Sequence, residues 1–136
     1  MCLILTVHLV EPDAARESEI CFAAGIPIRP RKWQRFGFVH RPSGAIQIPG
    51  PEGGCGCSFL NDTATGDSLT WSMNYATVPR LTGILRSIRH QTSGSFSFDA
   101  MWIGESPTEE CRVTIAELVH LVEQLKLGTK TRYLVD

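Results

Sequence analysis

The alternation of apolar and polar positions predicts a strand at the start of the chain. Aliphatic residues occupy every second position over residues 3–9, and the positions between them are also partly apolar. This pattern is typical of a central strand that is covered on most of both faces. After Pro12, the segment AARESEICFAA has the composition of a helix, and Gly25 stands where a helix commonly ends. We therefore expect a strand followed by a helix.

The middle of the chain predicts a hairpin and then a long loop. Aromatic residues alternate with other residues over 36–40, a turn-like Pro-Ser-Gly follows, and residues 45–48 suit a return strand. Another short strand is predicted over residues 57–60. Residues 61–77 show no clear period and are interpreted as a long loop, a feature that is often functional.

The remainder of the chain predicts two more helices. Residues 79–90 carry an apolar stripe of helical spacing, and residues 95–103 alternate as a strand does. Thr114 and Glu117 form a capping box at the start of a further helix, which Gly128 would end. The final residues, TRYLVD, are interpreted as a short edge strand.

The order of these elements predicts the fold class. The core follows the order β-α-β-β-α-β, which matches the split β-α-β arrangement of ferredoxin-like folds. We therefore predict an α+β protein with a ferredoxin-like antiparallel sheet, helices packed on one face, and an additional C-terminal helix. The length suits a single globular domain that spans residues 1–136.

Composition narrows the class of protein. The chain is 43% hydrophobic and 20% charged, as is typical of a folded globular protein, and its net charge of −1 argues against a protein that is basic overall. Five cysteines at scattered spacing argue against a disulfide scaffold. The apolar N-terminus is too short to span a membrane and lacks the layout of a signal peptide. We expect a cytoplasmic protein with no membrane partner.

The segment 49–57, PGPEGGCGC, contains the first candidate site. A tetrahedral zinc site needs four ligands, usually from two cysteine pairs, and the sequence has no second pair. We therefore expect no metal and no cofactor; if a metal binds, its predicted ligands are Cys55 and Cys57. A second interpretation is a thiol-dependent site, in which Cys57 acts with His40 or Asp62 as candidate catalytic residues. A third, which we favour, is that the cysteines are small buried residues at the start of a strand.

A basic and aromatic run at residues 29–41 is the second candidate. Four of its residues form a predicted binding surface: Arg31, Lys32, Trp33 and Arg35. Such a mixture can bind phosphates by charge and bases by stacking. The tetrapeptide FGFV at 36–39 resembles the centre of the RNP1 motif of RNA-recognition domains, which implies binding of single-stranded RNA. Arg35 stands where that motif has glycine, so we favour an ordinary hairpin strand and do not expect a nucleic-acid partner.

Asp99 stands out because it interrupts the apolar run FSFDAMWI. We interpret it as a solvated residue that joins Ser95 and Ser97 on the polar face of a strand. If that face is covered, Asp99 needs a partner, because an unpaired buried carboxylate is costly.

The sequence shows no concentrated catalytic signature such as His-Glu-x-x-His or a P-loop. We therefore expect a non-enzymatic binding or protein-interaction domain that uses residues 50–77, including Trp71 and Tyr75, to contact a small molecule or a protein. The alternatives are a metal or thiol site at Cys55 and Cys57 and, more weakly, RNA binding through residues 29–41. The oligomeric state is left open.

Overall fold

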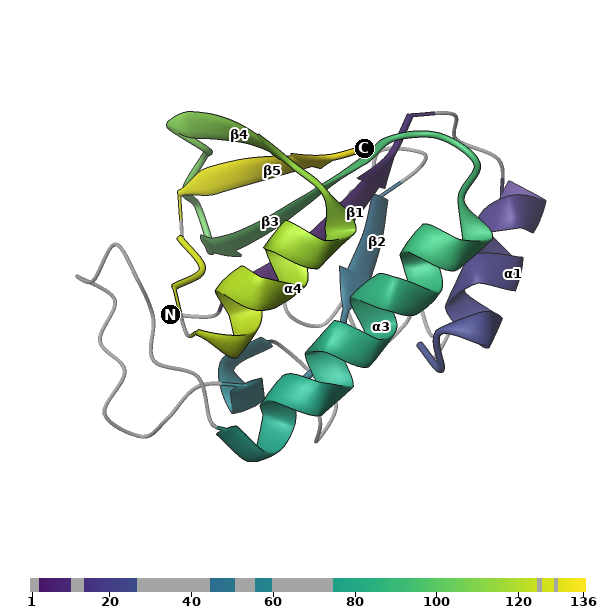
Figure 1. Cartoon of the computed structure of the whole chain (residues 1–136), viewed down its shortest axis with the longest axis horizontal. Helices are drawn as coiled ribbons and strands as arrows, with labels where there is room; N and C mark the ends of the chain where they lie inside the picture. The colour runs from purple at the N-terminus through teal and green to yellow at the C-terminus, as the bar shows by residue number, and fades with distance from the viewer. Residues whose placement is uncertain are drawn as a thin grey trace.

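The computed structural model describes residues 3–10, 14–26, 45–50, 56–59, 75–124, 126–128 and 130–136, with the backbone alone for residues 14–16, 57, 58 and 75. These residues form an α+β structure with one mixed sheet of five strands (Figure 1). The strands are β1 (Leu3–Leu9), β2 (Ala45–Ile48), β3 (Phe96–Trp102), β4 (Glu109–Val113) and β5 (Thr131–Val135). The α-helices are α1 (Ala14–Ala23), α3 (Val78–Gln91) and α4 (Ile115–Glu123), and 3₁₀ turns cover Gly56–Phe59 and Tyr75–Thr77.

The strand order is β2-β1-β3-β5-β4. β1 lies inside the sheet and pairs antiparallel with both β2 and β3, and β3 pairs antiparallel with β5. β4 and β5 pair in parallel, because α4 connects them as a crossover helix and parallel neighbours need such a connection. The sheet is therefore mixed, whereas the sequence pattern predicted an antiparallel one.

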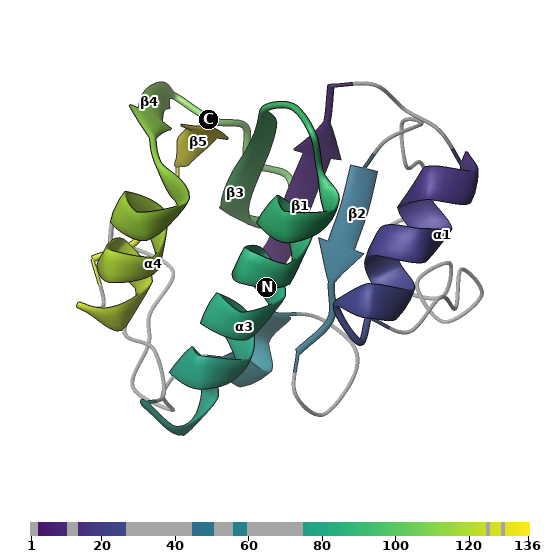
Figure 2. The same cartoon turned by 45° about the vertical axis from the view of Figure 1, so that its right-hand side comes forward.

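The three helices lie on one face of the sheet, which we call the helix face (Figure 2). Alternate residues of β1 and β3 point to this face and are buried, among them Leu5, Val7 and Phe98. The predicted apolar stripe of α3 packs into the same core: Leu81, Ile84, Leu85 and Ile88. Burial of these side chains is the main source of stability for such a sheet.

Local signals at the helix ends match the sequence prediction at two places. Gly25 has a φ of 69°, and Ile26 N–H donates to Cys21 O at 2.8 Å, which closes α1 with a Schellman turn. At the start of α4, Glu117 N–H donates to Thr114 Oγ1 at 3.2 Å, and Thr114 N–H donates to a Glu117 carboxylate oxygen at 2.7 Å. The predicted capping box is confirmed.

Other local predictions were wrong. The predicted last helix continues to Gly128, but α4 ends at Glu123. A Cβ at Gly128 would lie 2.8 Å from Thr131 Oγ1, so close approach of that hydroxyl explains this glycine. Residues 56–59 form a 3₁₀ turn where a strand was predicted. The C-terminal strand β5 is internal, since the strand β4, which the pattern did not predict, lies outside it.

No helix among the described residues is both long and apolar enough to cross a membrane.

Candidate binding site on the open face of the sheet

The face of the sheet opposite the helices, which we call the open face, carries polar side chains from every strand. The strand registers align one residue from each strand, in sheet order, in a single row: Gln47, Thr6, Asp99, Arg132 and Glu110. A neighbouring row aligns four more residues: His8, Ser97, Leu134 and Arg112. Directly opposed side chains interact strongly across strands, so these rows bring distant parts of the chain together.

Asp99 is the centre of the first row. Its exposure is only 4%, and it is the only buried charged residue in the described part of the chain. Arg132 Nε donates to Asp99 Oδ2 at 3.2 Å, and His8 Nε2 lies 3.3 Å from the same oxygen. The prediction that Asp99 is solvated was therefore wrong, and the expectation that a covered Asp99 needs a partner was correct.

This network costs a small domain solvation free energy. A buried carboxylate loses its hydration, and its attraction to a cation often only repays that loss. The partners are themselves a third exposed, with side-chain exposures of 35% for His8 and 32% for Arg132. Asp99 thus holds two partly exposed polar groups at defined positions on the open face. At the β2 end of the row, Gln47 Oε1 is also buried and has no hydrogen-bond partner among the described residues.

A hollow of about 290 Å³ lies at one end of this face, along the second row. Side chains of that row line it, together with residues at the adjoining strand ends: Leu9, Val10, Ser95, Phe96 and Asp136. Arg112 Nη1 lies 3.4 Å from Asp136 Oδ2, and Ser95 Oγ donates to Asp136 Oδ1 at 3.1 Å. The hollow therefore combines an imidazole, a guanidinium paired with a carboxylate, two hydroxyls and an apolar wall.

The residue types of a Ser-His-Asp triad meet here, but the described side chains are not joined as they are in a triad. In a triad the histidine accepts the serine proton on one nitrogen while the carboxylate holds the other. Among the described residues no hydrogen bond joins Ser97 to His8.

The predicted site residues fall mostly outside the described residues. This holds for Arg31, Lys32, Trp33, Arg35, His40, Cys55, Asp62 and Trp71. The backbones of Cys57 and Tyr75 lie in the two 3₁₀ turns, and their side chains are not described. Within the described residues no three groups from His, Cys, Asp or Glu come together as a metal site would require.

The glycine-rich segment meets the sheet at Gly56. A Cβ at this position would lie 3.0 Å from Leu5 Cγ and 3.2 Å from Leu3 O, so a side chain would press tightly against β1. Close approach to a strand therefore explains this glycine. The roles predicted for Cys55 and Cys57 beside this glycine stay predictions.

Sequence reasoning missed His8 and Arg132 as partners of Asp99. The available signal was Asp99 itself, because a carboxylate within an apolar run is costly unless a partner is near. The sequence does not show which strands pair, so it could not identify the partners.

Comparison of the chain with protein-family models, with curated proteins and with solved structures found no match. The function is therefore inferred from the residues of the open face.

Proposed function

We propose that this protein is a small binding domain that holds a ligand with an acidic group in the hollow on the open face. One observation carries this proposal: the buried Asp99 orients His8 at the wall of the hollow. An apolar pair of similar size would give equal or greater stability at that position. The network is better explained by a role in positioning His8 and Arg132 for binding.

The lining favours an acidic ligand with an apolar part. Arg112 is a guanidinium that can bind a carboxylate or phosphate through two parallel hydrogen bonds. Its present partner is Asp136, and the side chains of this pair are 72% and 46% exposed. Such an exposed ion pair contributes little free energy, so a ligand can replace Asp136 at small cost. Leu134 and Val10 supply the apolar contact.

The size of the hollow limits the ligand. Drug-sized ligands occupy pockets of roughly 300–1,000 Å³, so this hollow fits a molecule at the small end of that range. Phenylacetate has a suitable size, one carboxylate and an apolar ring. Benzylamine has the same ring and the opposite charge, and serves as the matched control ligand.

The test is a titration of the ¹⁵N-labelled protein with each compound, followed by two-dimensional NMR. Phenylacetate should shift the amide signals of Ser97, Leu134 and Arg112, and added salt should weaken the effect, because the attraction is partly electrostatic. Benzylamine should leave these signals unchanged. His8→Ala should weaken phenylacetate binding several-fold, and His120→Ala, which removes an exposed histidine of α4, should not.

Equal shifts with both compounds, or equal affinity in the two histidine variants, would contradict the proposal. The function would then be sought at the alternative sites that the sequence predicts. These are residues 50–77, a thiol or metal site at Cys55 and Cys57, and RNA binding through residues 29–41.

We also propose that the part of the sheet formed by β2, β1 and β3 is a ferredoxin-like core. Its support is that β1 lies between two antiparallel neighbours and that α1 and α3 cover one face. The predicted strand at 36–40, which belongs to the same expectation, lies outside the described residues. In this proposal, β4, α4 and β5 are an extension of the same sheet.

A further inference from the structure

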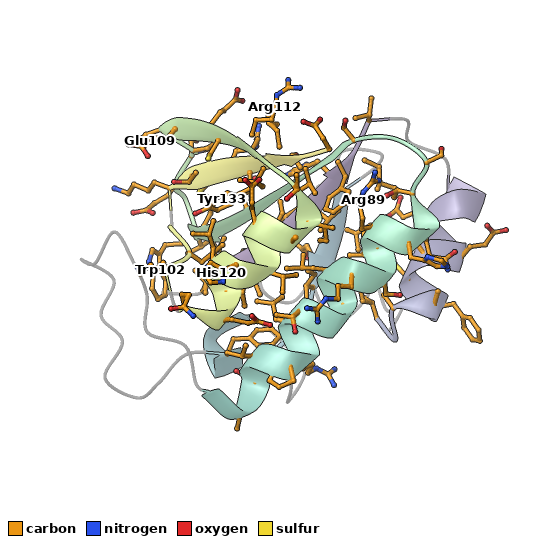
Figure 3. The ribbon with its side chains drawn as sticks, in the orientation of Figure 1. Arg89, Trp102, Glu109, Arg112, His120 and Tyr133 are labelled. Carbon is orange, nitrogen blue, oxygen red and sulfur yellow. The ribbon has the colours of Figure 1, made fainter. Side chains whose placement is uncertain are left out.

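The strand β4 forms one edge of the sheet among the described residues (Figure 1). Glu109, Glu110, Cys111 and Arg112 are all exposed along it, and only Val113 is buried. Figure 3 shows Arg112 projecting from β4 to the outside of the molecule. An exposed edge strand offers unpaired backbone groups to another strand.

The hydrogen bonds to β5 show which backbone groups of β4 face outward. Glu109 N–H donates to Lys130 O at 3.2 Å, and Val113 O accepts from Asp136 N–H at 3.1 Å. Because the N–H and C=O of one residue in a strand point to the same side, Glu109, Cys111 and Val113 face β5. The N–H and C=O groups of Glu110 and Arg112 therefore point away from the sheet.

These outward groups suit antiparallel pairing of β4 with a second β4. When the two-fold axis passes through Cys111, Glu110 of one copy lies directly opposite Arg112 of the other. Both members of each pair have outward backbone groups, so each pair exchanges two hydrogen bonds. The symmetry produces two such pairs, each with opposite charges.

The neighbouring registers are disfavoured by charge. Moving the axis to Glu110 places two glutamates opposite each other, and moving it to Arg112 places two arginines opposite each other. Like charges that are directly opposite destabilise a strand pair. Charge and backbone hydrogen bonding therefore select the same register.

We propose that a second copy of this chain docks on β4 in this register and joins the two sheets into one. The exposed Arg112–Asp136 pair does not prevent it, because a guanidinium has five donors and an exposed ion pair is weak. This proposal does not rest on the proposed ligand, although both interactions use the guanidinium of Arg112.

Charge reversal gives a sharp test, read out by sedimentation equilibrium. The wild-type chain should form a dimer. Glu110→Arg and Arg112→Glu should each weaken the dimer by about tenfold or more, because two attractive pairs become repulsive. A mixture of the two variants should dimerise again, because every opposed pair in the mixed dimer is attractive.

Controls separate this effect from loss of folding. Arg86→Glu changes an exposed arginine of α3, which pairs with Glu123 at 3.8 Å, and should leave the mass unchanged. Arg112→Pro removes an outward N–H and should also weaken the dimer, while circular dichroism shows that the fold is kept. A wild-type chain that is monomeric at high concentration, or single variants that dimerise as it does, would overturn the proposal.

Cys111 provides an independent reading of the register. In this arrangement the two Cys111 residues form a non-hydrogen-bonded pair with Cα atoms about 4.5 Å apart, within the range of a disulfide. Diamide, which takes up two electrons and two protons as the two thiols join, should yield a covalent dimer. Cys111→Ser should abolish it, and a wild-type chain that forms no Cys111–Cys111 disulfide under diamide would contradict the register.

Discussion

The two faces of the sheet use neighbouring residues for opposite purposes. Phe98 points to the helix face and is completely buried in an apolar core, whereas Asp99 points to the open face and holds two polar side chains. On the helix face, apolar burial stabilises the fold. On the open face, ionised groups are held at a cost in solvation that brings little stability. This difference indicates that the helix face maintains the structure and that the open face is arranged for recognition.

The largest effect that would test this division is expected at Phe98. Phe98→Ala removes a fully buried ring and should lower the free energy of unfolding by about 3–5 kcal/mol. The measurement is urea denaturation followed by circular dichroism. The matched open-face variant is Leu134→Ala, which removes a half-buried side chain and should cost only about 1 kcal/mol. Similar losses in the two variants would remove the energetic distinction between the faces.

Asp99 should give a smaller loss of stability and a several-fold loss of binding affinity. Asp99→Asn leaves Arg132 and His8 without their anionic partner and should cost about 1–3 kcal/mol. The double variant Asp99→Leu/Arg132→Met replaces the ion pair with apolar side chains and should return stability to within about 1 kcal/mol of the wild type or exceed it. Both variants should bind phenylacetate several-fold more weakly in the NMR titration, as His8→Ala does, because His8 is no longer oriented.

The double variant is the decisive arm of that experiment. If it is as unstable as Asp99→Asn, the network stabilises the fold and the open face resembles the helix face. If it is stable and binds phenylacetate as tightly as the wild type does, the network does not position the ligand groups.

The sequence predicted the regular parts of the helix face well. Alternation over β3 and the apolar stripe of α3 both reflect burial on one side, and burial selects apolar residues at the period of each element. β4 escaped prediction because four of its five residues are exposed, so no alternation marks it. Gly128 was misinterpreted because glycine marks both helix ends and close contacts, and only the structure shows Thr131 beside it.

The open face was predicted less well for a physical reason. Its site depends on pairing among β1, β3 and β5, and the side chains meet diagonally as well as directly across strands. Pairing between distant strands leaves no periodic signal in any one of them. Asp99 could therefore be identified as unusual, but neither His8 nor Arg132 could be assigned to it.

The smallest effect concerns Tyr133, a polar group on the helix face. Burial raises the pKa of its phenol above the ordinary value of 10.0, and its hydroxyl oxygen accepts a hydrogen bond from Gly128 N–H at 2.8 Å. Tyr133→Phe leaves that N–H unpaired and should cost about 1 kcal/mol at neutral pH. Because the unfolded chain ionises first as the pH rises, Tyr133 should make the wild type lose stability above pH 10.0, and the phenylalanine variant should lack that part of the loss. Urea denaturation of both proteins from neutral to alkaline pH measures the difference. A constant difference across that range would mean that the hydroxyl is not buried in the core. The Tyr133 hydroxyl on β5 would then be a solvated polar group on the otherwise apolar helix face.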